Sequence, residues 1–342
     1  MTDEPIQANL REELPDGQWN RPANGEGAPV ESTPAVIAAI AANIGIAIVK
    51  FIAAAISGSS AMISEGLHSF VDSGNGLLIL FGMKKASKKA DAEHPFGYSH
   101  ELYFWTMVVA VMIFALGGGL SIYEGISHLR AITPETTLGD PTMSYIVLAA
   151  SFVLESFSLS VALRNFNKAR GATKPLTFIR EAKDPSLFTV VFEDSAALLG
   201  LVFAFCGVFF GHMFNNPYLD GGASVLIGLL LCTVAIILLR ETKSLIIGEG
   251  LRAPEVQEVR ELVRQSPKVV ECGRILSLYL GPADLLVTID VTFESGITND
   301  EVVEATDEIE GRIVARFPQA TRIFIESESL KFARRGAAEA QQ

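Results

Sequence analysis

Charged residues are scarce in this sequence. Aspartate, glutamate, lysine and arginine together make up 19% of its 342 residues, whereas hydrophobic residues make up 49%, and the mean hydropathy is +0.34. Soluble globular domains carry about 25% charged residues. This shortage of charge argues against an ordinary soluble protein and predicts a membrane protein.

Cysteine is equally rare, and familiar catalytic and nucleotide motifs are missing. The three cysteines lie far apart without a C-x-x-C pair, which argues against a disulfide framework and against a cysteine zinc cluster. The sequence has no G-x-x-x-x-G-K-[ST] motif, so ATP is not predicted to drive the protein directly. The residue pattern indicates no catalysis, no organic cofactor and no nucleic-acid partner.

Six stretches are apolar and long enough to span a bilayer, which takes about 20 residues. They cover roughly 34–56, 59–82, 103–127, 143–164, 186–211 and 221–240. By the positive-inside rule both termini are cytosolic, because basic residues follow the second, fourth and sixth stretches: Lys84, Lys85, Lys88, Lys89, Arg164, Lys168, Arg170, Lys174, Arg180, Arg240 and Lys243. We therefore expect a multi-pass protein of the lipid bilayer, in the cell (inner) membrane.

The chain is predicted to have four parts. Residues 1–33 form an acidic tail rich in proline, glycine and asparagine, a composition typical of disorder. A membrane domain covers 34–248, a cytosolic domain covers 249–331, and a second disordered tail covers 332–342.

The cytosolic domain begins where the hydropathy falls, after about residue 250. A helix beginning near Pro254 precedes two alternating runs, RILSLYL and LLVTIDVTF, which a Gly-Pro-Ala-Asp turn joins. An amphipathic helix near 298–316 and the short strand TRIFIE follow. The order αββαβ predicts a small α+β domain, ferredoxin-like, with helices on one face of an open sheet.

Ionisable side chains interrupt the second and fifth apolar stretches, where each costs about 2.5–3.5 kcal/mol to insert. Glu65, His68 and Asp72 follow one another at i, i+3 and i+7, which places them on one stripe of a helix. Glu193 and Asp194 lie about eight residues from the cytosolic end of the fifth stretch. This depth is comparable with that of His68 and Asp72, so the two groups are predicted to meet.

An imidazole with two or three carboxylates suits a four-coordinate divalent ion such as zinc. The imidazole favours zinc, cobalt, nickel, iron or manganese over magnesium or calcium. The alternative for any one of these side chains is structural, as a packed histidine or as an acid that faces a water-filled vestibule.

Other polar groups in the spans have structural explanations. We expect Lys50 in the first span to form an ion pair with Glu124 near the outer end of the third. Glu155 is either an interhelical hydrogen-bond partner or a proton relay. Gly117–Gly119 are predicted to make close helix contacts.

Two motifs and the layout carry a family resemblance. The motifs are SGSSAMISEGLHSFVDSGNGLLILFG in the second span and DAEHPFGYSHE before the third. Over roughly residues 34–330 the sequence resembles a cation diffusion facilitator, a zinc-type exporter of divalent metal cations. The most specific parts are HSFVD at 68–72 and HPFG at 94–97.

The resemblance implies a transport site with two ligands from each of the second and fifth helices. His68 and Asp72 match the first pair, and Asp194 matches the aspartate of the second pair. Val190, however, stands where the family commonly has a histidine.

The fourth ligand is therefore open between Glu193 and Glu65. A site with fewer nitrogen ligands favours harder ions. Manganese, iron and cobalt thus become rivals to zinc as the transported metal.

The resemblance implies a second, loop metal site after the second helix. Asp91 and His94 match its ligands, but Tyr98 stands where a histidine is frequent. The loop site is expected to bind weakly, and the alternative is that His94 simply holds the loop in place.

Some family members also bind a regulatory metal in the cytosolic domain. Acids on exposed strand ends are otherwise simply solvated, so both interpretations stay open here. The residues that fall near the corresponding positions are Asp290, Glu326 and Glu328.

The resemblance further implies secondary transport by a homodimer that exports the metal, its substrate, by alternating access with proton antiport, and it implies no enzyme activity. Metal binding would displace protons from His68 and the nearby acids. Two other classes stay open. One is a metal-sensing or scaffold protein with a decayed transport site, and the other is a membrane-embedded metalloenzyme, which needs an open coordination position and a general base.

The charge separation of the loops yields a first prediction. In a cysteine-free background, Lys88→Cys and Lys174→Cys should react with a membrane-impermeant maleimide only from the cytosolic side. Asp140→Cys should react only from outside. The measurement compares intact cells with inverted vesicles, and the opposite pattern would overturn both the orientation and the direction of export.

Overall fold

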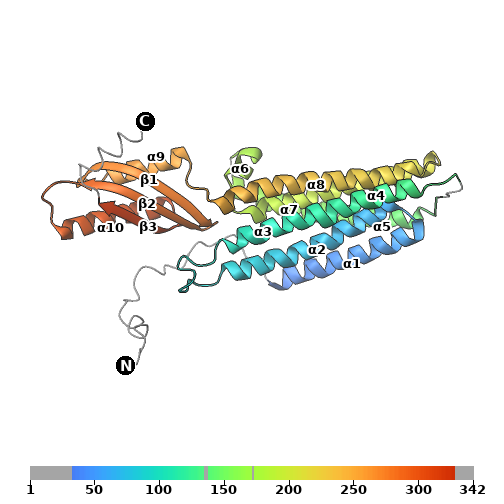
Figure 1. Ribbon diagram of the computed structural model, residues 1–342, viewed down its shortest axis with the longest axis horizontal. Coiled ribbons are helices and arrows are strands. Elements are labelled where there is room, and N and C mark those ends of the chain that lie inside the picture. The colour runs from blue at the N-terminus through green and yellow to red at the C-terminus, as the bar shows by residue number, and fades with distance from the viewer. Residues whose placement is uncertain (1–32, 135–137, 172, 328–342) are drawn as a thin grey trace, which may run out of the picture. The chain divides into compact units, whose positions relative to one another are not determined.

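The structure, a computed structural model, describes residues 33–134, 138–171 and 173–327. The chain divides into two compact units, one that ends at Ile247 and one that begins at Gly248 (Figure 1). The tails predicted to be disordered lie outside the described residues, apart from Thr33, at which the first helix begins.

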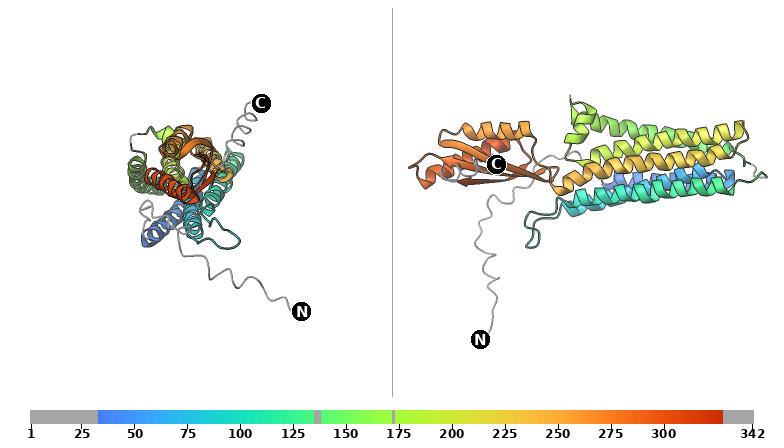
Figure 2. Two further views of the ribbon diagram at one scale, coloured as in Figure 1. Left: turned by 90° about the vertical axis from the view of Figure 1, so that its left-hand side faces the viewer. Right: turned by 45° about the horizontal axis from the view of Figure 1, so that its top comes forward.

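The described helical unit contains six spans, as predicted. A short helix that was not predicted, α6 (Pro175–Glu181), lies between the fourth and fifth spans. Figure 2 shows the long helices running side by side. In chain order the spans are α1 (Thr33–Ser57), α2 (Ser60–Ala86), a third span of α3 (Glu101–Met112), the π-helix η2 (Ile113–Gly119) and α4 (Leu120–Ala131), then α5 (Thr142–Arg170), α7 (Pro185–Met213) and α8 (Tyr218–Ile247).

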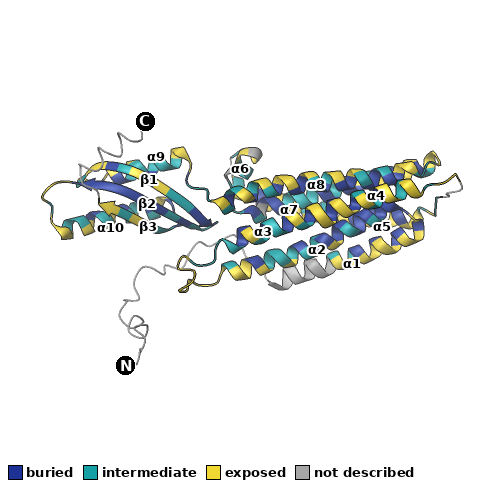
Figure 3. Ribbon diagram, in the orientation of Figure 1, coloured by how far each residue is buried: buried dark blue, intermediate teal, exposed yellow. Residues whose placement is uncertain are grey.

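Length and composition support a membrane location for this unit. Four described stretches are long and apolar enough to cross a bilayer, namely 101–131, 142–170, 188–213 and 218–247, and the described apolar part of α1 covers 43–57. Exposed residues are spread along the helices (Figure 3), and large apolar side chains are among them, such as Val153 and Phe157 of α5, which are 68% and 71% exposed. Such a surface suits lipid rather than water. The chain is therefore a multi-pass membrane protein.

The α2 helix lies inside the unit, where it packs against α1, α3, α7 and α8. The third span and α8 also approach closely, through glycine. A Cβ atom at Gly118 would lie 2.4 Å from Sγ of Cys232 and 3.0 Å from the carbonyl oxygen of Gly228. The predicted close contacts hold for Gly117 and Gly118, whereas a Cβ atom at Gly119 would meet only its own span.

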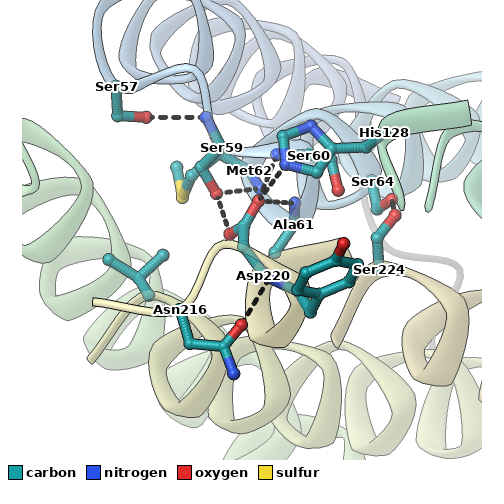
Figure 4. Close-up of polar contacts among 12 residues, drawn as sticks. Ser57, Ser59, Ser60, Ala61, Met62, Ser64, His128, Asn216, Asp220 and Ser224 are labelled. Atoms are coloured by element: carbon teal, nitrogen blue, oxygen red, sulfur yellow. Dashed lines mark hydrogen bonds and ion pairs between the residues drawn. The ribbon is translucent and has the colours of Figure 1, made fainter. Parts of the chain in front are cut away.

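A carboxylate of α8 fixes the beginning of α2 (Figure 4). Asp220, in the first turn of α8, accepts hydrogen bonds from the backbone N–H groups of Ser60 at 2.6 Å and Ala61 at 3.4 Å. The hydroxyl of Ser59 donates to Asp220 and accepts from the N–H of Met62 at 3.2 Å. These contacts satisfy the N–H groups that the start of a helix leaves unpaired, and an acid at this end also suits the helix dipole. The position of α2 along its axis is thus tied to α8.

The C-terminal unit has the predicted αββαβ order. Among the described residues it forms a three-stranded sheet in the order β1-β2-β3, with β1 and β2 antiparallel and β2 and β3 parallel. Both helices pack on one face, where Val259 and Ile309 join Val287 and Ile289 in a buried core. The elements are α9 (Ala253–Arg264), β1 (Val269–Gly281), β2 (Asp284–Phe293), α10 (Asn299–Arg316) and β3 (Ala320–Ser327).

Candidate functional site

The polar stripe of α2 is buried inside the helical unit. Glu65 and His68 are 0% and 2% exposed, and Asn75, one turn beyond Asp72, is 1% exposed. Nδ1 of His68 lies 3.3 Å from Oδ1 of Asp72, which is an ion-pair distance. The two atoms do not form a hydrogen bond, and Nε2 of His68 also has no hydrogen-bond partner among the described residues.

All four side chains of this stripe carry a buried atom without a hydrogen-bond partner among the described residues. The atoms are Oε1 of Glu65, Nε2 of His68, Oδ1 of Asp72 and Oδ1 of Asn75. A buried polar group that lacks its partner costs about 1–3 kcal/mol. Each of these atoms has a lone pair to offer, so the stripe fits a cation and its water better than it fits a closed protein core.

The two acids of α7 are held by different helices. Oε1 of Glu193 accepts a hydrogen bond from Nδ2 of Asn75 on α2 at 2.9 Å. Oδ2 of Asp194 accepts one from the hydroxyl of Ser158 on α5 at 2.8 Å. The two carboxylates, together with Glu155 of α5, lie close enough to Asp72 for their charges to repel one another.

The predicted ligands therefore share one region, but they do not form a closed shell. No three histidine, cysteine, aspartate or glutamate side chains of the described residues lie close enough together to hold a metal ion. His68 and Asp72 stand together on α2, and Glu193 and Asp194 stand on α7, which packs against it. A bound cation would have to draw the two pairs together.

Lys50 has a different partner from the predicted one. Its Nζ lies 3.0 Å from Oε2 of Glu65 and 2.9 Å from the hydroxyl of Ser69, both on α2. The predicted Lys50–Glu124 pair is wrong, because α1 packs along α2 and presents Lys50 to the acid of that helix. Oε2 of Glu65 is therefore held by Lys50, which makes Glu65 less available as a metal ligand.

Asn75 is the site residue that sequence reasoning missed. It continues the stripe of Glu65, His68 and Asp72 by a further three residues, on the same face of the helix. That spacing was the available signal. The side chain carries no charge, so a search for ionisable groups passes over it.

Asp91 and His94, the predicted ligands of the loop site, lie close together, but Asp91 already makes hydrogen bonds to other side chains of the loop. Oδ2 of Asp91 accepts hydrogen bonds from Lys88 at 2.8 Å and from the hydroxyl of Tyr98 at 2.7 Å, and these contacts hold the pKa of the Asp91 carboxyl well below its usual range. Nδ1 of His94 lies 3.6 Å from Oδ1 of Asp91. A metal at this predicted loop site would have to compete with the Lys88 ammonium.

The acids of the C-terminal unit lie next to each other across two strands. Asp290 of β2 is opposite Glu326 of β3 in the parallel register, and Nε of Arg274 lies 3.5 Å from Oδ2 of Asp290. Glu328 lies outside the described residues. A regulatory metal at these acids stays a prediction.

Comparison with known proteins agrees with this architecture. The sequence profile of the cation efflux transmembrane domain matches residues 36–247. The mitochondrial proton-coupled zinc antiporter SLC30A9 of Xenopus laevis is 31% identical over 261 residues, which are 75% of this chain and 46% of that protein. Metal tolerance protein C4 of Arabidopsis thaliana is 29% identical over 278 residues, 80% of this chain and 60% of that protein. Magnetosome protein MamM of Paramagnetospirillum magneticum is 25% identical over 181 residues, 53% of this chain and 52% of that protein.

The six spans, the buried acceptors of α2 and the C-terminal α+β unit together define a membrane protein of the cation efflux class. The chain belongs to the cation diffusion facilitator family, as the resemblance predicted. It spans about half the length of the zinc antiporter that it matches.

Asn75 yields a second prediction. Asn75→Leu keeps the size of the side chain but leaves Glu193 unheld, so the affinity for Zn²⁺ should fall about 10- to 100-fold, as for other residues that orient metal ligands. Calorimetric titration of the purified full chain measures this. Asn165→Leu, on an exposed position of α5, is the control and should bind like the wild type. Equal affinities in all three proteins would show that Asn75 does not support the site.

Proposed function

We propose that the protein is a secondary transporter that exports a divalent metal cation from the cytosol by alternating access and proton antiport, with zinc as the first candidate. The observation that carries this proposal is the row of buried lone pairs on α2, above all Nε2 of His68 beside Asp72. Family membership and the printed name of the relative SLC30A9, a proton-coupled zinc antiporter, support it.

The proposed ligands are His68, Asp72, Asp194 and Glu193. Glu193 ranks before Glu65 as the fourth ligand, because its carboxylate is oriented toward α2 by a neutral amide. The Oε2 atom of Glu65, in contrast, is already held by an ammonium group.

Proton exchange follows from the chemistry of these groups. Imidazole and carboxylate bind a metal only in their deprotonated forms, so metal binding from the cytosol releases protons. Protons that arrive from the outer side compete for the same lone pairs and favour release of the metal. We propose Glu155, whose charge interacts with that of Asp194, as a proton relay, and an interhelical hydrogen-bond role is the alternative.

The remaining proposals concern the setting of the protein. We propose that it works as a homodimer in the cell (inner) membrane with both termini in the cytosol, that metal ions and protons are its partners, and that it needs no organic cofactor. A metal-sensing or scaffold role is the alternative. Flux measurements separate the two, because a sensor binds metal without moving it.

His68 and Asp72 provide the direct test. His68→Ala and Asp72→Ala each remove a proposed ligand, so zinc flux into proteoliposomes should be abolished while expression and folding stay largely intact. Glu124→Ala changes a membrane acid outside the stripe and serves as the control. Wild-type flux in both ligand variants would refute the proposed site.

The choice of metal rests on the departure at Val190. This side chain is one turn from Asp194 on α7 and is 40% exposed. Val190→His would add an imidazole one helical turn from Asp194 and should raise the affinity for zinc relative to that for manganese, because nitrogen ligands favour zinc. Competition binding with the two ions measures the ratio. If it does not change, residue 190 does not face the metal.

A further inference from the structure

Lys50 is the only lysine or arginine that is buried among the residues whose side chains the structure describes, and it is 0% exposed. An ammonium group inside a membrane domain is costly unless a partner compensates it. The buried ammonium group of Lys50 therefore needs a specific partner, and its presence suggests a specific role.

The partner of Lys50 is Glu65, and their contact joins α1 to α2. Nζ of Lys50 on α1 lies 3.0 Å from Oε2 of Glu65 and 2.9 Å from Oγ of Ser69, one turn along α2. The other oxygen of Glu65 has no hydrogen-bond partner among the described residues. This atom faces α7, because a Cβ atom at Gly200 would lie 2.5 Å from it.

The charge of Lys50 also acts on the proposed transport site. It interacts with His68, Asp72 and Glu155 as well as with Glu65. Glu65 precedes His68 by one helical turn, so without Lys50 its carboxylate would add both a negative charge and an oxygen ligand beside the bound ion. A transporter needs a site that binds its ion and still lets it leave.

We propose that Lys50 is a resident counter-cation that holds Glu65 away from the transported ion and thereby keeps the transport site weak enough to release it. This inference rests on the proposed function. Lys50 acts here through a fixed charge and through Glu65, so it is a positioning residue and not a ligand.

The test is a set of variants that change the charge of Lys50, of Glu65 or of both. Lys50→Met removes a positive charge and frees Glu65, so the affinity for Zn²⁺ should rise at least about 10-fold, because a unit negative charge attracts a divalent ion strongly at the effective dielectric of a protein, while zinc turnover in proteoliposomes falls. Glu65→Gln leaves the ammonium uncompensated and should lower the affinity. The double variant Lys50→Met/Glu65→Gln should return the affinity to near the wild-type value. Lys50→Arg keeps the charge and should bind like the wild type.

The direction of the change in zinc affinity distinguishes this role from a merely structural one. Loss of a structural ion pair would lower stability, affinity and turnover together, and Lys50→Met would then not bind zinc more tightly. If Lys50→Met does not fold, Glu65→Gln and the double variant decide together, because an unchanged affinity in Glu65→Gln, or an affinity in the double variant no higher than in Glu65→Gln, overturns the proposal.

The outcome also separates this inference from the proposed function. If the wild type binds and transports zinc, and His68→Ala and Asp72→Ala abolish both, an unchanged affinity in Lys50→Met overturns only the role of Lys50. If the wild type neither binds nor moves a divalent metal, the proposed function itself fails, and the role of Lys50 fails with it.

Discussion

The need to satisfy polar groups in the absence of water governs the helical unit. A lipid environment offers no hydrogen bonds, so a helix as polar as α2 is stable there only when other helices surround it. The α2 helix packs against α1, α3, α7 and α8. Three of these neighbours each supply a partner for a polar group of α2. Lys50 of α1 holds Glu65, Glu193 of α7 accepts from Asn75, and Asp220 of α8 caps the first turn.

The polar groups that remain without partners mark the proposed transport site. Once these neighbours have been assigned, the stripe still carries four buried atoms without partners among the described residues, on Glu65, His68, Asp72 and Asn75. A fold built for stability alone would pair such groups or replace them by apolar ones. Their presence on one face, opposite two further carboxylates, is what connects the packing of the bundle to the proposed movement of a cation.

Periodicity and composition were sufficient for the architecture, since the six spans and the αββαβ order each have a strong repeating signal. Spacing along a single helix likewise placed His68 beside Asp72. The partner of Lys50 was mispredicted, because it depends on how α1 is rotated against α2, which the hydropathy of either helix does not determine. The capping role of Asp220 depends on a contact between residues about 160 positions apart, and Asn75 carries no charge to attract notice. Tertiary packing decides all three.

Proton-coupled movement of zinc tests the account most directly. The purified full chain is reconstituted into proteoliposomes with an acidic lumen, and zinc influx and lumenal pH are followed together after zinc is added outside. The account predicts that zinc enters as the lumenal pH rises, and that a protonophore, by collapsing the gradient, slows the influx. Zinc influx that is the same with and without the gradient, or no zinc influx in either case, would contradict it.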